Sequence, residues 1–177
     1  MRSQLKDLIL PLLITLFIFL GLNIASTALL PAFGLSTYIL PFNVLFVLYL
    51  GFKLQTLWLP VMIFIVQYFF SFFSIEGWEL GTIAGILICV LISYLRDLIH
   101  LSSAPMTILV TQIFQFVWFV IVSVLIYFKT GDMVYIAERF WRFVPESIFI
   151  SLMAPLAFLV LDKFWKLKDG VSLGEEV

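Results

Sequence analysis

Long uncharged runs separated by short polar segments dominate the chain, and their lengths predict helices that cross a membrane. An α-helix rises about 1.5 Å per residue, so roughly 20 apolar residues cross a hydrocarbon core of about 30 Å. Divided by that length, the runs predict six transmembrane helices at about residues 8–30, 36–52, 54–75, 80–99, 105–128 and 145–165. We therefore expect an all-α integral membrane protein with one polytopic domain over residues 1–177 and a short tail from about residue 166.

Prolines mark several of the expected helix boundaries. Pro31 closes the first span, and Pro105 and Pro145 stand where the first turns of the fifth and sixth helices are expected. Pro155 falls inside the last span, where it removes one backbone hydrogen bond and predicts a kink. The first span lacks a small-residue cleavage site, so we expect a retained helix and not a signal peptide.

The composition supports the membrane interpretation. The chain is 63% hydrophobic and 12% charged, with 20 Phe, and its mean hydropathy is +1.17. Such a sequence has too few polar residues to cover a water-soluble surface. A net charge of −1 gives no attraction to nucleic acid. The single cysteine, Cys89, excludes an internal disulfide and is expected to be a packing residue.

The distribution of Lys and Arg predicts the orientation, because cytoplasmic segments retain positive charge. If the N-terminus is inside, the inner segments carry seven basic residues and the outer segments three. Both termini are therefore expected in the cytoplasm. The inner set is Arg2, Lys6, Lys53, Arg96, Lys163, Lys166 and Lys168, and the outer set is Lys129, Arg139 and Arg142.

Arg96, Asp97 and the single histidine, His100, cluster where the fourth helix is expected to reach the cytoplasmic face. Asp97 is three residues from His100 and can pair with it, while Arg96 can extend to lipid phosphates. A structural cluster at the interface is favoured over a proton relay, because residues 54–75, 80–95 and 101–128 contain no Asp, Glu, Lys, Arg or His that would continue a relay. An enzyme acting on lipid headgroups would have to use these same three residues.

Five amides lie deep in the expected spans, and in hydrocarbon such groups normally seek partners on neighbouring helices. Bonding between helices is the favoured interpretation, and a binding pocket is the alternative. Gly81 and Gly85 have the spacing that allows close helix approach. The amides are Asn23, Asn43, Gln67, Gln112 and Gln115.

The segment 129–147 between the last two spans has polar and apolar residues on opposite sides of a helix, and we expect an amphipathic outer helix at about 130–145. Arg139, Trp141 and Arg142 could anchor it at the interface, or they could contact a partner protein, since Arg and Trp are common interface anchors. Both alternatives stay open.

No metal-ligand spacing, phosphate-binding loop, nucleophile motif or cysteine pair is present, and Glu76 and Glu79 lie in a short polar turn. We therefore expect no catalytic residues, no metal, no cofactor and a role other than catalysis.

Three stretches resemble the MreD family of bacterial inner-membrane proteins. They are "LPFNVLFVLYLGFK", with its proline and asparagine before an aliphatic run, "ELGTIAGILICVLISYLRDLI", with its Leu-Gly turn, and "ESIFISLMAPLAFLVLDKFWK", with its internal proline and basic end. One departure is the end of the third helix, where the family often carries Gly and Asp and this chain has Gln67 and "YFFSFFS".

The resemblance implies a multi-pass protein of the bacterial inner membrane that serves as a scaffold of the cell-elongation machinery. It would bind MreC, a protein with one membrane helix and a periplasmic domain, and connect cytoplasmic MreB filaments to peptidoglycan synthases. The family is also similar in fold to the six-helix substrate-binding subunits of energy-coupling-factor vitamin transporters. Such a subunit is the alternative function, and it predicts an outer pocket lined by aromatics and amides, with Trp78 and Trp141 as candidates.

Overall fold

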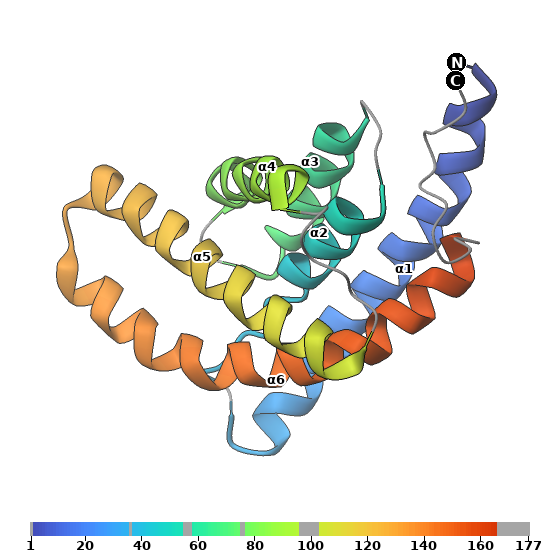
Figure 1. Cartoon of the computed structure of the whole chain (residues 1–177). Coiled ribbons are helices and arrows are strands. Elements are labelled where there is room, and N and C mark those ends of the chain that lie inside the picture. Colours follow the sequence, from blue (N-terminus) through green and yellow to red (C-terminus); the bar gives the residue numbers. More distant parts are fainter. Residues whose placement is uncertain (1, 36, 55–57, 75–76, 96–102, 166–177) are drawn as a thin grey trace.

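The computed structural model describes residues 2–35, 37–54, 58–74, 77–95 and 103–165, and side chains of the first helix from Leu8 onward. These residues form six helices and so confirm an all-helical chain (Figure 1). Four helices are long and apolar enough to cross a membrane, while two have only 12 residues each. The helices are α1 (Arg2–Ala32), α2 (Phe42–Lys53), α3 (Leu59–Phe70), α4 (Gly77–Leu95), α5 (Ala104–Thr130) and α6 (Met133–Trp165).

The short helix α2 lies at the centre of the fold and packs against all five others (Figure 1). Every residue from Phe42 to Phe52 is buried, which suits a helix that is apolar on all sides. The sequence predicted a start near residue 36, but the helix begins after Pro41, because a residue that precedes proline is disfavoured in the α conformation. At 12 residues, α2 is about 18 Å long, less than the thickness of the hydrocarbon core.

Helix α3 is also shorter than the span predicted over residues 54–75. It has Pro60 in its first turn and ends before Ser71. Its partner is α4, and the contact depends on two glycines. A Cβ at Gly85 would lie 2.6 Å from Cγ2 of Ile63, and a Cβ at Gly81 would overlap Oε1 of Gln67. The close approach predicted from the glycine spacing is thus confirmed, with α3 as the neighbouring helix.

Helices α5 and α6 form a long antiparallel hairpin that extends beyond the other helices (Figure 1). Helix α5 agrees with the predicted fifth span and has Pro105 in its first turn. It ends at Gly131, whose φ of 69° is the left-handed conformation that glycine adopts at little cost. The next residue, Asp132, caps α6 by accepting the backbone N–H groups of Val134 and Tyr135 at 2.9 and 3.1 Å.

Helix α6 differs from its prediction. The sequence suggested an outer amphipathic helix followed by a sixth helix that begins at Pro145, but α6 is one continuous, curved helix of 33 residues with Pro145 and Pro155 inside it (Figure 1). Proline at position 145 deprives the carbonyl of Trp141 of its usual donor. Trp141 is an exposed residue, so solvent can satisfy that carbonyl and the helix continues.

Candidate functional site

The residues singled out from the sequence fall into two regions. Arg96, Asp97 and His100 lie outside the described residues, so the interfacial cluster stays a prediction. Arg139, Trp141 and Arg142 lie on the first half of α6, but they do not share one face. Arg139 and Arg142 line a pocket, whereas Trp141 points away from it and is 76% exposed.

Aromatic contacts hold the first half of α6 against α5. The ring of Phe119 stacks on Phe143 at 4.6 Å and meets Phe140 at 5.8 Å. The Arg139 guanidinium lies 5.7 Å from the centre of the same Phe119 ring, a cation–π geometry. Arg142 lies 3.8 Å from Glu138 one turn earlier. Arg139 is therefore turned inward toward α5, while Arg142 remains accessible at the pocket's rim.

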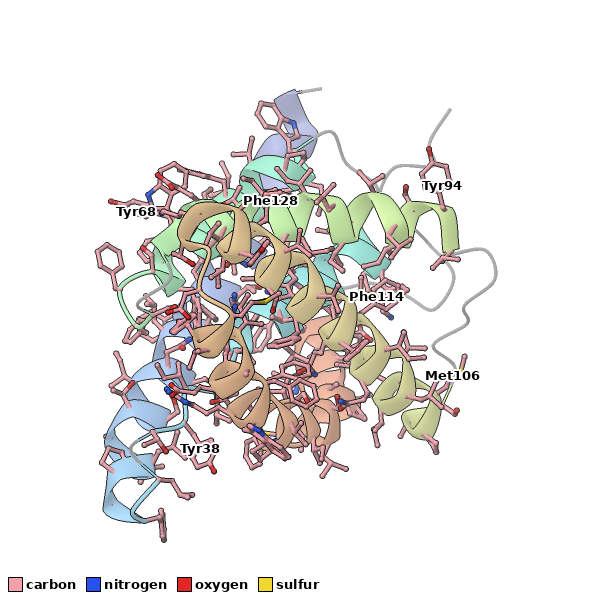
Figure 2. All side chains as sticks on the ribbon, turned by 90° about the vertical axis from the view of Figure 1, so that its left-hand side faces the viewer. Tyr38, Tyr68, Tyr94, Met106, Phe114 and Phe128 are labelled. Atoms are coloured by element: carbon pink, nitrogen blue, oxygen red, sulfur yellow. The ribbon has the colours of Figure 1, made fainter. Side chains whose placement is uncertain are left out.

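Beyond these contacts, the end of the hairpin is exposed on most sides. Phe128, Met133, Val134 and Trp141 are large apolar side chains that protrude there. Figure 2 looks onto the hairpin, with Phe128 near this end of α5 and Met106 near the other. We call these four residues the hairpin tip. A surface of this composition suits an interface with lipid headgroups or with another protein.

The pocket lies where the start of α2, the end of α3, the middle of α5 and the first half of α6 meet, and its volume is about 140 Å³. Aromatic rings form much of its wall, and two arginines and one glutamate are its charged residues. The lining residues are Thr37, Ile39, Pro41, Asn43, Val44, Phe70, Ser74, Gln115, Trp118, Phe119, Tyr135, Arg139, Arg142, Phe143 and Glu146.

Two buried amides from different helices reach this pocket. Asn43 is 3% exposed and donates from Nδ2 to Oε1 of Gln67 at 2.9 Å. Gln115 is 1% exposed and donates from Nε2 to Oγ of Ser151 at 3.0 Å. Within the described part of the chain, Oδ1 of Asn43 and Oε1 of Gln115 have no hydrogen-bond donor. Two side chains that line the pocket therefore each carry a buried acceptor oxygen without a donor.

The other deep amides mostly join helices, as the sequence predicted. Gln112 donates to Oγ of Ser147 at 3.0 Å and accepts the hydroxyl of Ser151 at 2.8 Å, so α5 and α6 are linked by a short polar network. The prediction was wrong for Asn23, which donates to the carbonyl of Phe19 on its own helix at 2.8 Å.

Sequence reasoning missed two features. Asp162 joins α6 to α2 through Lys53 and Tyr49, although its position near the end of an apolar run was visible in the sequence. The tryptophan at the pocket is Trp118 and not the expected Trp78 or Trp141. Trp78 instead packs on Phe64 at 5.3 Å. Nothing in the local sequence distinguishes Trp118 from the other residues of its apolar run.

Among the described residues, no group of three or more His, Cys, Asp or Glu side chains could hold a metal ion. The chain matches no family model, no curated protein and no solved structure in the three comparisons made with it.

Proposed function

We propose that this chain is a membrane scaffold without catalytic activity in the bacterial cell-elongation machinery, the role that the resemblance to MreD implies. It binds an MreC-like protein and thereby links cytoplasmic MreB filaments to peptidoglycan synthesis in the inner membrane. The observation that carries this proposal is the α5–α6 hairpin, whose tip protrudes beyond the other helices with apolar and aromatic side chains exposed.

The hairpin also offers a place for a single membrane helix. A shallow groove runs between α5 and α6 at the level of Gln112 and Ser151, and its walls are otherwise apolar. In a bilayer, helices associate through close packing and a few polar contacts, so a groove of this composition suits a helical partner. The groove is lined by Pro105, Ile108, Leu109, Gln112, Ile113, Ile148, Ser151 and Leu152.

The proposed orientation has both termini in the cytoplasm, with α2 and α3 as a pair of short crossings that completes six. Two contacts support a shared side for the basic ends of α2 and α6. Lys53 at the end of α2 pairs with Asp162 of α6 at 3.2 Å. The indole of Trp165 at the end of α6 donates to Thr15, in the first half of α1, at 3.0 Å, which places the end of α6 beside the half of α1 nearer the N-terminus. The hairpin tip and the pocket then lie at the outer side, where the periplasmic domain of an MreC-like partner is available.

Site-specific photo-crosslinking of the full chain in membranes tests the scaffold role. A crosslinking amino acid in place of Trp141 or Ile113 should capture a co-expressed MreC-like protein. The matched control is Tyr94, which lies on α4 and is 77% exposed, against 76% for Trp141. Capture at the two hairpin positions but not at Tyr94 supports the proposal. If neither Trp141 nor Ile113 captures the partner, the hairpin is only a lipid anchor and the proposal loses its basis.

The pocket favours a second candidate, the substrate-binding subunit of an energy-coupling-factor vitamin transporter. Such a subunit needs a pre-formed site lined by aromatics and a few amides, which is the composition found beside Trp118. Isothermal titration of the purified chain with water-soluble vitamins separates the two functions. Tight binding of one vitamin, together with capture of a transporter subunit in place of the MreC-like protein, would favour this candidate.

A further inference from the structure

Two side chains that line one pocket each carry a buried acceptor oxygen without a donor, and together they point to a ligand. Oδ1 of Asn43 and Oε1 of Gln115 come from α2 and α5, are almost completely buried, and lack a donor within the described residues. A buried acceptor without a donor is costly, and most such groups in folded proteins are satisfied by protein, water or ligand. The amide nitrogens of both side chains already have acceptors, so each amide is held in place with its oxygen left over.

The supports behind these amides keep the oxygens fixed. Gln67, which accepts the hydrogen bond from the Asn43 amide, lies directly against Gly81, where an added Cβ would overlap its Oε1. Gln115 is tied to Ser151, whose hydroxyl is donated to Gln112. Both acceptors are thus held by contacts between helices, as expected for a site that is organised before a ligand arrives.

The size and walls of the pocket limit what can enter. Its volume is about 140 Å³, close to that of cavities of about 150 Å³ that hold one benzene molecule. Phe70, Trp118, Phe119 and Phe143 contribute aromatic surface, which favours a flat or ring-shaped group. The part of the ligand inside the pocket is therefore about one ring in size.

The charges of the pocket set the sign of the ligand. Arg139 and Arg142 contribute two positive charges and Glu146 one negative charge, so the formal charge of the lining is +1. Glu138, which is not part of the lining, lies 3.8 Å from Arg142 and offsets part of that charge. Glu146 is also engaged, because its Oε1 accepts the backbone N–H of Ile39 at 3.0 Å. A cation is disfavoured there, and a neutral or anionic group is favoured.

We infer that this pocket binds a neutral or anionic molecule whose inner end is a single ring with N–H or O–H donors, directed at Asn43 and Gln115. The ring belongs either to a free small molecule or to the headgroup of a lipid, because both can present the same N–H or O–H donors to the pocket. This inference goes beyond the scaffold role and does not depend on it. A ligand there contacts α2, α3, α5 and α6 together, so its occupancy would stabilise the position of the outer half of α6.

Three probes and two blocked analogues test the inference on the full chain in phosphatidylcholine nanodiscs. Uracil and hydroquinone are neutral rings with two donors each, and phosphatidylinositol carries a hydroxylated ring in an anionic lipid. The analogues are 1,3-dimethyluracil and 1,4-dimethoxybenzene, which keep the rings but lose the donors. Saturation-transfer NMR measures binding of the soluble compounds, and native mass spectrometry measures retention of the lipid.

Binding of at least one donor-bearing probe, weakened about tenfold or more by loss of its donors, supports the inference, because a tenfold change matches one good hydrogen bond. Retention of phosphatidylinositol alone identifies a lipid source, and binding of a free ring identifies a soluble one. Equal binding of a probe and its blocked analogue overturns the inference. The absence of binding by all three probes also overturns the inference, because the pocket would then hold only water.

Two variants then test whether the ligand binds at Asn43 and Gln115. Gln115→Met keeps the length of the side chain but removes the acceptor, and Asn43→Leu does the same on α2. Each should abolish or weaken binding about tenfold. Gly21→Ala, on a part of α1 with nothing near the added Cβ, is the control and should bind as the unaltered chain does. The comparison of probe and blocked analogue needs no variant, so it remains decisive if either substitution prevents folding. Unchanged binding by both folded variants would contradict the assignment of the binding site to this pocket.

Discussion

Lys53 Nζ lies 3.2 Å from Oδ2 of Asp162 and joins the end of α2 to the end of α6 across 109 residues of sequence. The other carboxylate oxygen of Asp162 accepts the hydroxyl of Tyr49 at 3.0 Å. Both charged side chains are only 27% exposed. Partial burial weakens screening by solvent, so this contact is expected to contribute more than an ordinary surface ion pair.

Replacing Asp162 should therefore destabilise the bundle. Asp162→Asn leaves the Lys53 ammonium without its counter-charge, and we expect a coupling free energy between Lys53 and Asp162 of roughly 1–2 kcal/mol in a double-mutant cycle with Lys53→Met. The measurement is the midpoint of unfolding in detergent for the unaltered chain, each single variant and the double variant.

The pair between Lys129 and Glu79 is the matched control for that cycle. Its atoms are 4.0 Å apart and both side chains are 63% exposed. Its coupling should stay below about 0.5 kcal/mol, as for most exposed ion pairs. Equal coupling in the two pairs would mean that burial has no effect on the contact at Asp162.

The hydrophobic pattern predicted three of the four long helices and failed for the two short ones. A run of apolar residues between charges fixes how much chain can cross a bilayer, so α1, α4 and α5 agree with prediction to within a few residues, as far as the described ranges extend. The same rule assigned whole spans to α2 and α3, because it cannot tell lipid-facing residues from those buried among other helices. Only the fold shows that α2 is enclosed on every side.

Only part of the pocket could be predicted from the sequence. That Asn43 and Gln115 are deep amides was evident from the sequence, and their bonding to neighbouring helices followed from the scarcity of partners in hydrocarbon. That they reach the same cavity depends on the packing of α2 against α5, which no local pattern encodes. The inward turn of Arg139 was missed for a related reason, because its contact with Phe119 lies on a different helix.

Close packing of α3 on α4 predicts a strong effect at Gly85. In Gly85→Ala the new methyl would lie 2.6 Å from Cγ2 of Ile63, too close for real Cβ contacts, so the Ile63 side chain or helix α3 must shift. Such overpacking typically costs about 1–3 kcal/mol. Thermal unfolding in detergent should show a lower midpoint. Gly21→Ala should instead leave stability unchanged or raise it by up to about 1 kcal/mol, because alanine favours a helix and nothing lies near its Cβ.

The polar network between α5 and α6 predicts a loss of stability when Ser151 is replaced. The Ser151 hydroxyl accepts a hydrogen bond from Gln115 and donates one to Gln112. Ser151→Ala removes this hydroxyl, so both amides lose a partner at once. Bonds of this kind contribute about 0.6 kcal/mol on average within membrane proteins, so a loss of roughly 1 kcal/mol is expected. Hydrogen exchange of α5 amides should rise in parallel. Ser93→Ala, at an exposed serine whose partner among the described residues is the carbonyl of Val90 on its own helix, should change neither quantity.

The contact between Trp165 and Thr15 predicts unequal effects at its two ends. The indole N–H donates to Oγ1 of Thr15 at 3.0 Å, and the threonine hydroxyl donates to the carbonyl of Pro11 at 2.7 Å. Trp165→Phe removes the donor but leaves the hydroxyl bonded to Pro11. Thr15→Val leaves a buried indole N–H without an acceptor, so it should cost more, by about 1 kcal/mol. In the double variant the orphaned donor is gone, and its loss of stability should be smaller than the sum of the two single losses. Unfolding midpoints in detergent provide all three values, and strictly additive losses would show that the indole N–H is satisfied by another group.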